Sequence, residues 1–157
     1  MMALISLTLS LASVAYAVMP QGGGSVYLNG GVYKFVPGQQ DSSAIAWGYY
    51  KDMTLTASGF GQLSVNTNNK FNDTTQMFAA GYLEAALTQE RIWTHTNNAF
   101  AWITSQFKGG VIPDNVKAFF VSQDAWTRQQ IATNTSDHWV GMGSILAQFD
   151  GLVAGCE

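Results

Sequence analysis

The spacing of apolar residues changes once along the chain, near Asp73, and this change constrains the fold more than any other feature. Before Asp73 the apolar residues fall in short runs rich in β-branched and aromatic side chains, separated by glycine, proline and asparagine. After Asp73 they recur every three or four residues in long segments. Several strands followed by several helices predict an α+β fold, because a parallel sheet would instead need strands and helices to alternate.

The first part of the chain predicts a sheet that is at least partly antiparallel. The candidate strands are the two halves of 25–36, then 44–52, and then 60–67. Between the first two stand Asn29, Gly30 and Gly31, and an Asn-Gly pair favours a tight hairpin turn because its central residues take positive φ. So short a sheet needs helices packed on one face for stability.

The second part predicts about four helices. They span 73–87, about 88–107, 114–133, and about 136 to the end. We expect Asp73 and Asp114 to act as N-caps. In the first helix Ala79, Leu83 and Leu87 recur every four residues and should form one buried face.

Small and large apolar residues predict how these helices pack. Gly81 and Ala85 form a small-residue pair that would let another element approach the first helix closely. The second helix should bury Ile92, Ala99, Phe100, Ile103 and Phe107. The last helix carries an apolar stripe of Trp139, Met142, Leu146, Phe149 and Val153.

The N-terminus predicts a signal peptide over residues 1–17. Residues 3–14 form an apolar run of signal-peptide length, too short to span a bilayer, and Ala15 and Ala17 supply the small residues that a signal peptidase reads. The alternative is a buried N-terminal helix or strand. Two sequons agree with a secretory route: Asn72 in "NDT" and Asn134 in "NTS" are candidate glycosylation sites. Each is otherwise an ordinary loop asparagine, and Asn72 is also a candidate helix cap.

Composition excludes several classes of partner. Charged residues make up 11% of the chain, the net charge is −3, and there is no basic stripe, so we expect no nucleic-acid partner. The apolar fraction of 47% is enough for a core, and a single cysteine cannot form an internal disulfide. His95 and His138 are the only histidines, too few for a metal site without carboxylates. We expect both to be structural or surface residues, and we expect the chain to need no metal or cofactor.

Few residues suggest chemistry. Glu84 in "AAGYLEAAL" and Asp150 in "QFDGL" lie among small and apolar residues, so they are candidate buried carboxylates, with a raised pKa if unpaired. The alternative is that each belongs to the polar face of its helix. Trp93, Trp126 and Trp139 would either line a groove for a lipid acyl chain or fill the core.

Cys156 is the one cysteine and the penultimate residue of the sequence. A cysteine nucleophile needs a base and surroundings that lower its pKa. Cleavage just before Cys156 would leave only a dipeptide, which cannot form an active site. We therefore expect Cys156 to be an ordinary thiol and expect no catalytic residue in this chain.

Three ordered segments carry a family resemblance. "AIAWGYYKDMTLTASGFGQLSVNT", "FNDTTQMFAAGYLEAALTQERIWTHTNNAF" and "AQFDGLVAGC" resemble the N-terminal part of the phospholipase B-like family, which includes laminal ancestor and lysosomal proteins. The most specific stretch is "QMFAAGYLEAALT". Two positions depart from the family: Ala85 stands where glycine is commoner, and Cys156 where tyrosine is commoner.

The resemblance implies a fold and a reaction. Family members resemble N-terminal nucleophile hydrolases with an αββα sandwich, and they are secreted or lysosomal glycoproteins. Internal cleavage of the precursor frees an N-terminal cysteine, which attacks the acyl ester of a phospholipid. Because that cysteine lies well beyond the segment matching "FDGLVAG", residues 18–157 are expected to be the N-terminal segment of the domain. The partners implied are the missing C-terminal part of the same precursor and a lipid substrate. The alternatives are an amidase-type member and a truncated, inactive secreted glycoprotein with a binding or structural role.

Overall fold

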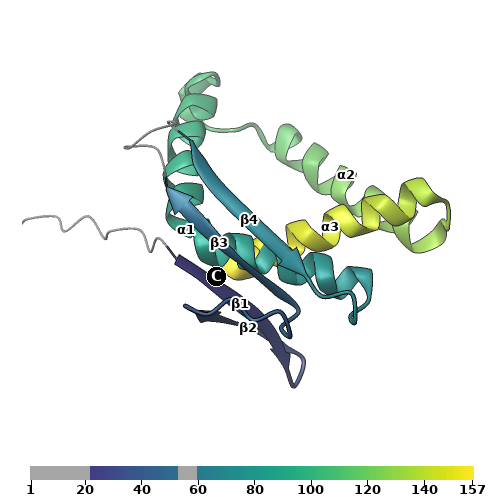
Figure 1. The fold of residues 1–157 in the computed structure, drawn as a ribbon. Helices are drawn as coiled ribbons and strands as arrows, with labels where there is room; N and C mark the ends of the chain where they lie inside the picture. Colours follow the sequence, from purple (N-terminus) through teal and green to yellow (C-terminus); the bar gives the residue numbers. More distant parts are fainter. Residues whose placement is uncertain (1–21, 53–59) are drawn as a thin grey trace, which may run out of the picture.

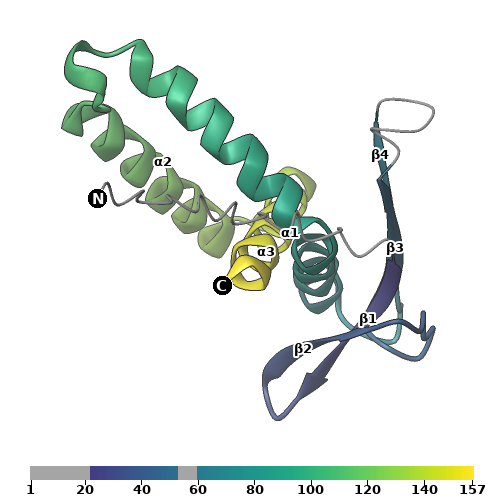
Figure 2. The ribbon, with the colours of Figure 1, turned by 90° about the vertical axis from the view of Figure 1, so that its left-hand side faces the viewer.

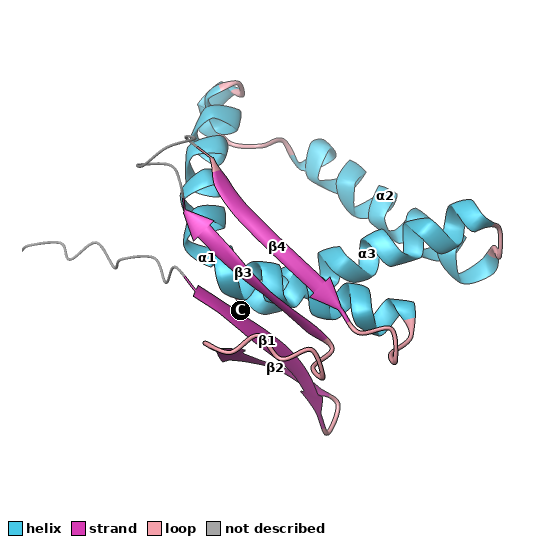
Figure 3. Ribbon diagram, in the orientation of Figure 1, coloured by secondary structure: helices cyan, strands magenta, loops and turns pink. Residues whose placement is uncertain are grey.

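The computed structural model describes residues 22–52 and 60–157, so the signal peptide predicted for residues 1–17 lies outside the described residues (Figure 1). The strands are β1 (Gly22–Asn29), β2 (Val32–Pro37), β3 (Ala46–Asp52) and β4 (Gly61–Thr67). The helices are α1 (Asp73–Ser105), α2 (Asp114–Thr133) and α3 (Asp137–Cys156), with a 3₁₀ turn at Lys108–Gly110. The predicted α+β class and its order of strands before helices are confirmed (Figure 3).

The four strands form one antiparallel sheet in the order β2-β1-β3-β4. The predicted hairpin joins β1 to β2, with Asn29 opposite Val32. Its two turn residues are Gly30 and Gly31, at φ 58° and 84°, so the pair at the tip is Gly-Gly, with Asn29 as the last strand residue. Positive φ at both positions is the requirement of the tight turn that matches strand twist.

The core lies between one face of this sheet and the first half of α1. Val26, Ala46 and Tyr50 point from β1 and β3 toward the helix, and all are buried. Opposite them, the predicted helix face of Ala79, Leu83 and Leu87 is confirmed, since each is at most 5% exposed. Figure 2 shows the three described α-helices on this side of the sheet. The sheet therefore buries only one face against helices in the described part of the chain.

A single helix replaces the two predicted between residues 73 and 107. α1 runs without interruption for 33 residues, so the described residues hold three α-helices, not about four. The predicted helix start near Thr88 is wrong, because Thr88 lies within a continuing helix. Its hydroxyl donates a hydrogen bond to the Glu84 carbonyl at 2.7 Å. Nothing between Leu87 and Arg91 is a glycine or proline that would break it.

The two predicted aspartate caps are also wrong by one position. Asn72 is the N-cap of α1, and its Oδ1 accepts a hydrogen bond from the Thr75 amide at 2.9 Å. Asp73 is instead the first helical residue, where its charge favours the helix N-terminus. Pro113 precedes α2, and Asp114 stands in its first turn. The start of α3 after Ser136 agrees with the prediction.

α3 packs against the far side of α1 through small residues (Figure 1). A Cβ added at Gly81 would stand 1.9 Å from the Gln148 carbonyl oxygen, and one added at Gly155 would stand 2.7 Å from the Ala85 Cβ. The close approach predicted for Gly81 and Ala85 is therefore confirmed. The predicted stripe on α3 is not its buried face, because Phe149 and Val153 are exposed whereas Ala147 and Gly151 are buried.

The outer half of α1 and all of α2 bury little. The prediction of a buried face there is wrong for Phe100 and Ile103, which are exposed. α2 has no buried residue, and its Phe119 and Phe120 are both exposed. In the described part of the chain, α2 contacts α3 but not α1.

Candidate functional site

The face of the sheet turned away from α1 carries one depression. Its volume is about 450 Å³, and it is lined by Gly22, Gly23, Gln40, Tyr49, Tyr50 and Lys51. The Lys51 ammonium lies 5.3 Å from the centre of the Tyr49 ring, a cation–π distance. The Lys51 ammonium, the Gln40 amide and the Tyr49 phenol offer hydrogen bonds, but this lining holds no cysteine, serine or histidine.

A polar cluster holds the loop after β2 against the same face. The Tyr27 hydroxyl donates to Asp41 Oδ2 at 2.6 Å, and the Ser25 hydroxyl donates to the Gln39 carbonyl at 2.9 Å. In return the Asp41 amide donates to Ser25 Oγ at 2.8 Å. The hydrogen bond from Tyr27 lowers the pKa of Asp41, and the same bond raises the pKa of Tyr27. With no histidine or cysteine in it, this cluster positions the loop.

Sequence reasoning missed this cluster. Its one local signal is "DSS" at residues 41–43, because Asp41 Oδ1 accepts from the Ser43 amide at 2.8 Å in an Asx turn. Ser25 and Tyr27 come from a strand fourteen residues or more earlier, so only the fold brings them to Asp41.

Cys156 lines a second depression, between the middle of α1 and the end of α3. Its volume is about 330 Å³, and its lining is Gln89, Glu90, Ile92, Trp93, Thr96 and Cys156. The thiol residue is half-buried, and its backbone carbonyl accepts from Gln89 Nε2 at 3.0 Å. No histidine lines this depression, so the thiol lacks the usual partner of a cysteine nucleophile.

The two candidate carboxylates have different surroundings. Glu84 is half-buried on the α3 side of α1, where Gln148 Nε2 lies 3.4 Å from its Oε2. The Asp150 side chain is 39% exposed and accepts two hydrogen bonds from the Arg128 guanidinium, at 2.8 and 2.9 Å. This ion pair lowers the pKa of Asp150, so the carboxylate is a charged partner of arginine.

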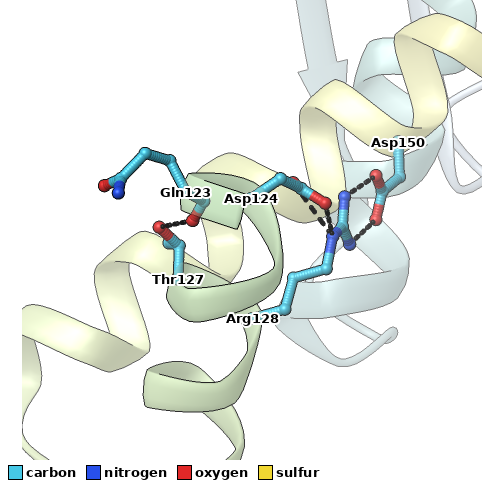
Figure 4. Close-up of polar contacts among 5 residues, drawn as sticks. All are labelled: Gln123, Asp124, Thr127, Arg128 and Asp150. Carbon is cyan, nitrogen blue, oxygen red and sulfur yellow. Dashed lines mark hydrogen bonds and ion pairs between the residues drawn. The ribbon is translucent and has the colours of Figure 1, made fainter. Parts of the chain in front are cut away.

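Arg128 joins two helices, a role that no local sequence pattern indicates. Its guanidinium also contacts Asp124 one turn earlier in α2, at 2.9 Å, so it lies between two carboxylates (Figure 4). Both hydrogen bonds raise the pKa of Arg128, which remains a cation. The i, i+4 spacing of Asp124 and Arg128 predicts their pairing, but the partner on α3 is 22 residues away.

The remaining candidate residues are spread over the helices. His95 is exposed, and His138 lies edge-on to Trp139 with ring centres 4.9 Å apart. Trp93 and Trp126 are exposed, so neither fills the core of the described structure. Within residues 22–52 and 60–157, no group of three or more His, Cys, Asp or Glu side chains could hold a metal ion. The same residues contain no helix long and apolar enough to cross a membrane.

Both sequon asparagines are exposed at helix ends. Asn72 uses Oδ1 for its cap bond, and that oxygen is separate from Nδ2, the atom that a glycan would occupy. Asn134 follows α2, and its Nδ2 donates to the Gln130 carbonyl at 2.9 Å.

Comparison with known proteins identifies a family. The Phospholipase B family profile matches residues 46–157, which include β3, β4 and the three described α-helices. The chain is 37% identical to a phospholipase B of Crotalus adamanteus over 119 residues, which cover 73% of this chain and 21% of that protein. It is 34% identical to phospholipase B-like protein B of Dictyostelium discoideum over 73% of this chain and 20% of that protein.

A human relative matches over similar shares of the two sequences. The chain is 31% identical to human phospholipase B-like 1 over 74% of its own length and 21% of that protein. This chain thus spans about a fifth of the curated relatives that it matches. Since the profile covers well over half of the sequence, the chain belongs to the phospholipase B family.

Proposed function

We propose that this chain is the N-terminal segment of a phospholipase B-type hydrolase that removes fatty acyl chains from phospholipids. One observation carries the proposal: the family profile matches residues 46–157, yet this stretch corresponds to about a fifth of the relatives. Neither of the two depressions described above joins a cysteine to a histidine, which is consistent with a nucleophile elsewhere in a longer protein.

The proposed reaction uses an N-terminal cysteine that lies outside this chain. Its thiolate would attack the ester carbonyl, the lysophospholipid would leave, and water would then release the fatty acid from the thioester. The cysteine's own α-amine would accept and return the proton. Cys156 has no part in this scheme, and the segment described here would supply structural support for the reacting site.

The sheet supports an αββα sandwich of the N-terminal nucleophile type as the fold of the whole protein. α1 covers one face, while the outer face carries the half-buried aromatic side chains of Trp47 and Tyr49. A second sheet packed on that face, with helices of its own, would bury them in the usual two-sheet core. Residues 18–157 would then form one half of the sandwich.

A secretory location is part of the proposal. The predicted signal peptide at residues 1–17 and the sequons at Asn72 and Asn134 support it, and both asparagines are exposed. Expression in a secretory host, with mass analysis before and after N-glycosidase treatment, tests both features. An intracellular product that retains residues 1–17 would contradict this location.

A chimera tests the activity. Residues 46–157 would replace the matching segment of the Crotalus adamanteus phospholipase B, and fatty acid release from phosphatidylcholine would be measured. We expect the secreted chimera to hydrolyse the lipid, the 157-residue chain alone to be inactive, and Cys156→Ala in the chimera to retain full activity. Acyl release by the chain alone that disappears with Cys156→Ala would overturn the proposal. An inactive but folded chimera would favour the non-catalytic glycoprotein.

A further inference from the structure

An exposed apolar segment projects from the packed part of the molecule. It comprises the outer half of α1 and all of α2, residues 92–133, and we call it the helical arm (Figure 2). Its exposed side chains include Trp93, Phe100, Trp102, Phe119, Phe120 and Val121. Trp102 is 67% exposed and Val121 is 71% exposed, although soluble proteins usually keep such groups out of contiguous exposed patches.

The apolar residues of the arm surround its helices. Trp93 and Phe100 are seven residues apart on one side of α1, whereas Trp102 is about half a turn away from Trp93 at 3.6 residues per turn. On α2, Phe119 and Val121 point in nearly opposite directions for the same reason. Each helix therefore exposes large apolar side chains, among its polar residues, in opposite directions.

The charges of the arm give it no basic face. Asp114 pairs with Lys117 at 3.0 Å, and Asp124 pairs with Arg128 at 2.9 Å. A helix that lies on a membrane surface combines one apolar stripe with a polar face rich in lysine and arginine. The arm has neither, so an enclosing protein suits it better than a lipid surface.

The arm is held to the rest of the described structure at two places. α1 carries one end out from the sheet, and the other end is fixed to α3 by Arg128 and Asp150. Between the same two helices, the rings of Trp126 and Trp139 meet edge-on with centres 5.7 Å apart. The segment between these attachments is exposed, which leaves both of its sides open to a partner.

We propose that the helical arm is enclosed by the remainder of a phospholipase B-length polypeptide, and this inference rests on the proposed function. The family profile includes the whole arm, and about four-fifths of the relatives' length lies outside the matched segment. A twofold contact with a second copy of this chain would cover one side of each helix only. A long polypeptide can cover several sides at once.

Association in trans tests this arrangement. The full 157-residue chain is co-expressed in a secretory host with a separate chain, the part of the Crotalus adamanteus phospholipase B that follows the matched segment. Complex formation is measured by co-purification and light scattering. The arm variant is Trp102→Gln with Phe120→Gln. The control is Val140→Gln on α3, which removes an exposed apolar side chain (57%) that lies outside the arm and away from the sheet.

The expected result is a one-to-one complex that the arm variant weakens by about tenfold or more, as interface aromatics do, while the control retains it. Circular dichroism of the free chains should be unchanged, because both arm residues are exposed. The absence of a complex, or equal loss in arm variant and control, would overturn the inference. So would arm-dependent dimers of this chain, or arm-dependent flotation with phosphatidylcholine vesicles. An arm-dependent complex without acyl release would leave this inference standing and count against the proposed function.

Discussion

Gly151 of α3 lies directly against the backbone of Phe78 in α1, and a Cβ at residue 151 would stand 2.0 Å from the Phe78 carbonyl oxygen. The contact is reciprocal, since Gly81 of α1 faces the Gln148 carbonyl of α3 in the same way. The two helices therefore meet backbone to backbone. This contact places α3 behind the helix that covers the sheet.

Gly151→Ala should therefore destabilise the fold by about 2 kcal/mol or more, because the methyl group forces the helices apart. The matched control is Gly141→Ala, also in α3, where an added Cβ meets nothing within 4 Å. We expect that control to stabilise the helix by about 0.5–1 kcal/mol. Urea denaturation followed by circular dichroism measures both. Equal effects of the two substitutions would show that α1 and α3 do not pack this closely.

The two predicted roles of Asn72, as a helix cap and as a glycosylation site, can be tested separately. Asn72→Ala removes the cap of α1 and should cost about 1 kcal/mol, whereas Asn72→Asp keeps an oxygen for the Thr75 amide and should cost less. Thr74→Ala leaves the cap intact but destroys the sequon. Thermal melts report the cap, and gel mobility of the secreted protein reports the glycan. A Thr74→Ala protein with unchanged mobility would mean that Asn72 carries no glycan.

The ion pair between Arg128 and Asp150 should make the junction of α2 and α3 sensitive to acid. The pKa of Asp150 is lowered from its ordinary value of 3.8. The contribution of this carboxylate to stability is therefore fully present above pH 3.8, and it is lost as the pH falls through the lower pKa of the folded state. Fluorescence of Trp126 and Trp139, which also meet between α2 and α3, reports the junction when it is titrated from pH 6 to pH 2.

Asp150→Asn should remove that acid transition at the junction. Arg128→Met should cost about 1 kcal/mol or less, as exposed ion pairs do. Lys117→Met, which breaks a pair within α2 alone, is the control and should leave the titration unchanged. A transition that persists in Asp150→Asn would assign it to another carboxylate.

The isolated 157-residue chain should fold poorly. Its exposed apolar side chains on the helical arm favour non-specific aggregation, without a defined dimer, and binding of the dye ANS. We expect a broad calorimetric transition, and we expect the Trp102→Gln, Phe120→Gln variant to bind less dye without a loss of helix. A sharp, reversible melt of a monomer would contradict this prediction.

The sequence predicts the elements of this fold better than their boundaries. Turn chemistry at Gly30 and Gly31 and the four-residue recurrence of Ala79, Leu83 and Leu87 are local signals, so the hairpin and the buried face of α1 follow from them. A threonine such as Thr88 is common at a helix start. It also fits inside a helix when its hydroxyl donates a hydrogen bond to the carbonyl four residues earlier, here that of Glu84.

Burial and long-range pairing were harder to predict. Periodicity identifies an apolar face on Phe100 or Phe149, but it does not say whether anything covers that face in the chain at hand. The partner of Asp150 is an arginine on another helix, and the partner of Asp41 is a tyrosine on a strand. Such pairs depend on how helices and strands pack. The apolar neighbours of Asp150 in the sequence suggest a buried carboxylate, but they do not indicate its arginine partner.

The unbroken length of α1 has a mechanical consequence. The helix is about 50 Å long at 1.5 Å per residue, and only its first half rests on the sheet. The half beyond Thr88 is a rigid lever of about 25 Å. A rotation of about 5° about Thr88, where the helix leaves the sheet, would therefore displace the far tip by about 2 Å. A small change in the packing of α1 against the sheet would thus become a larger displacement at the far end of the helix.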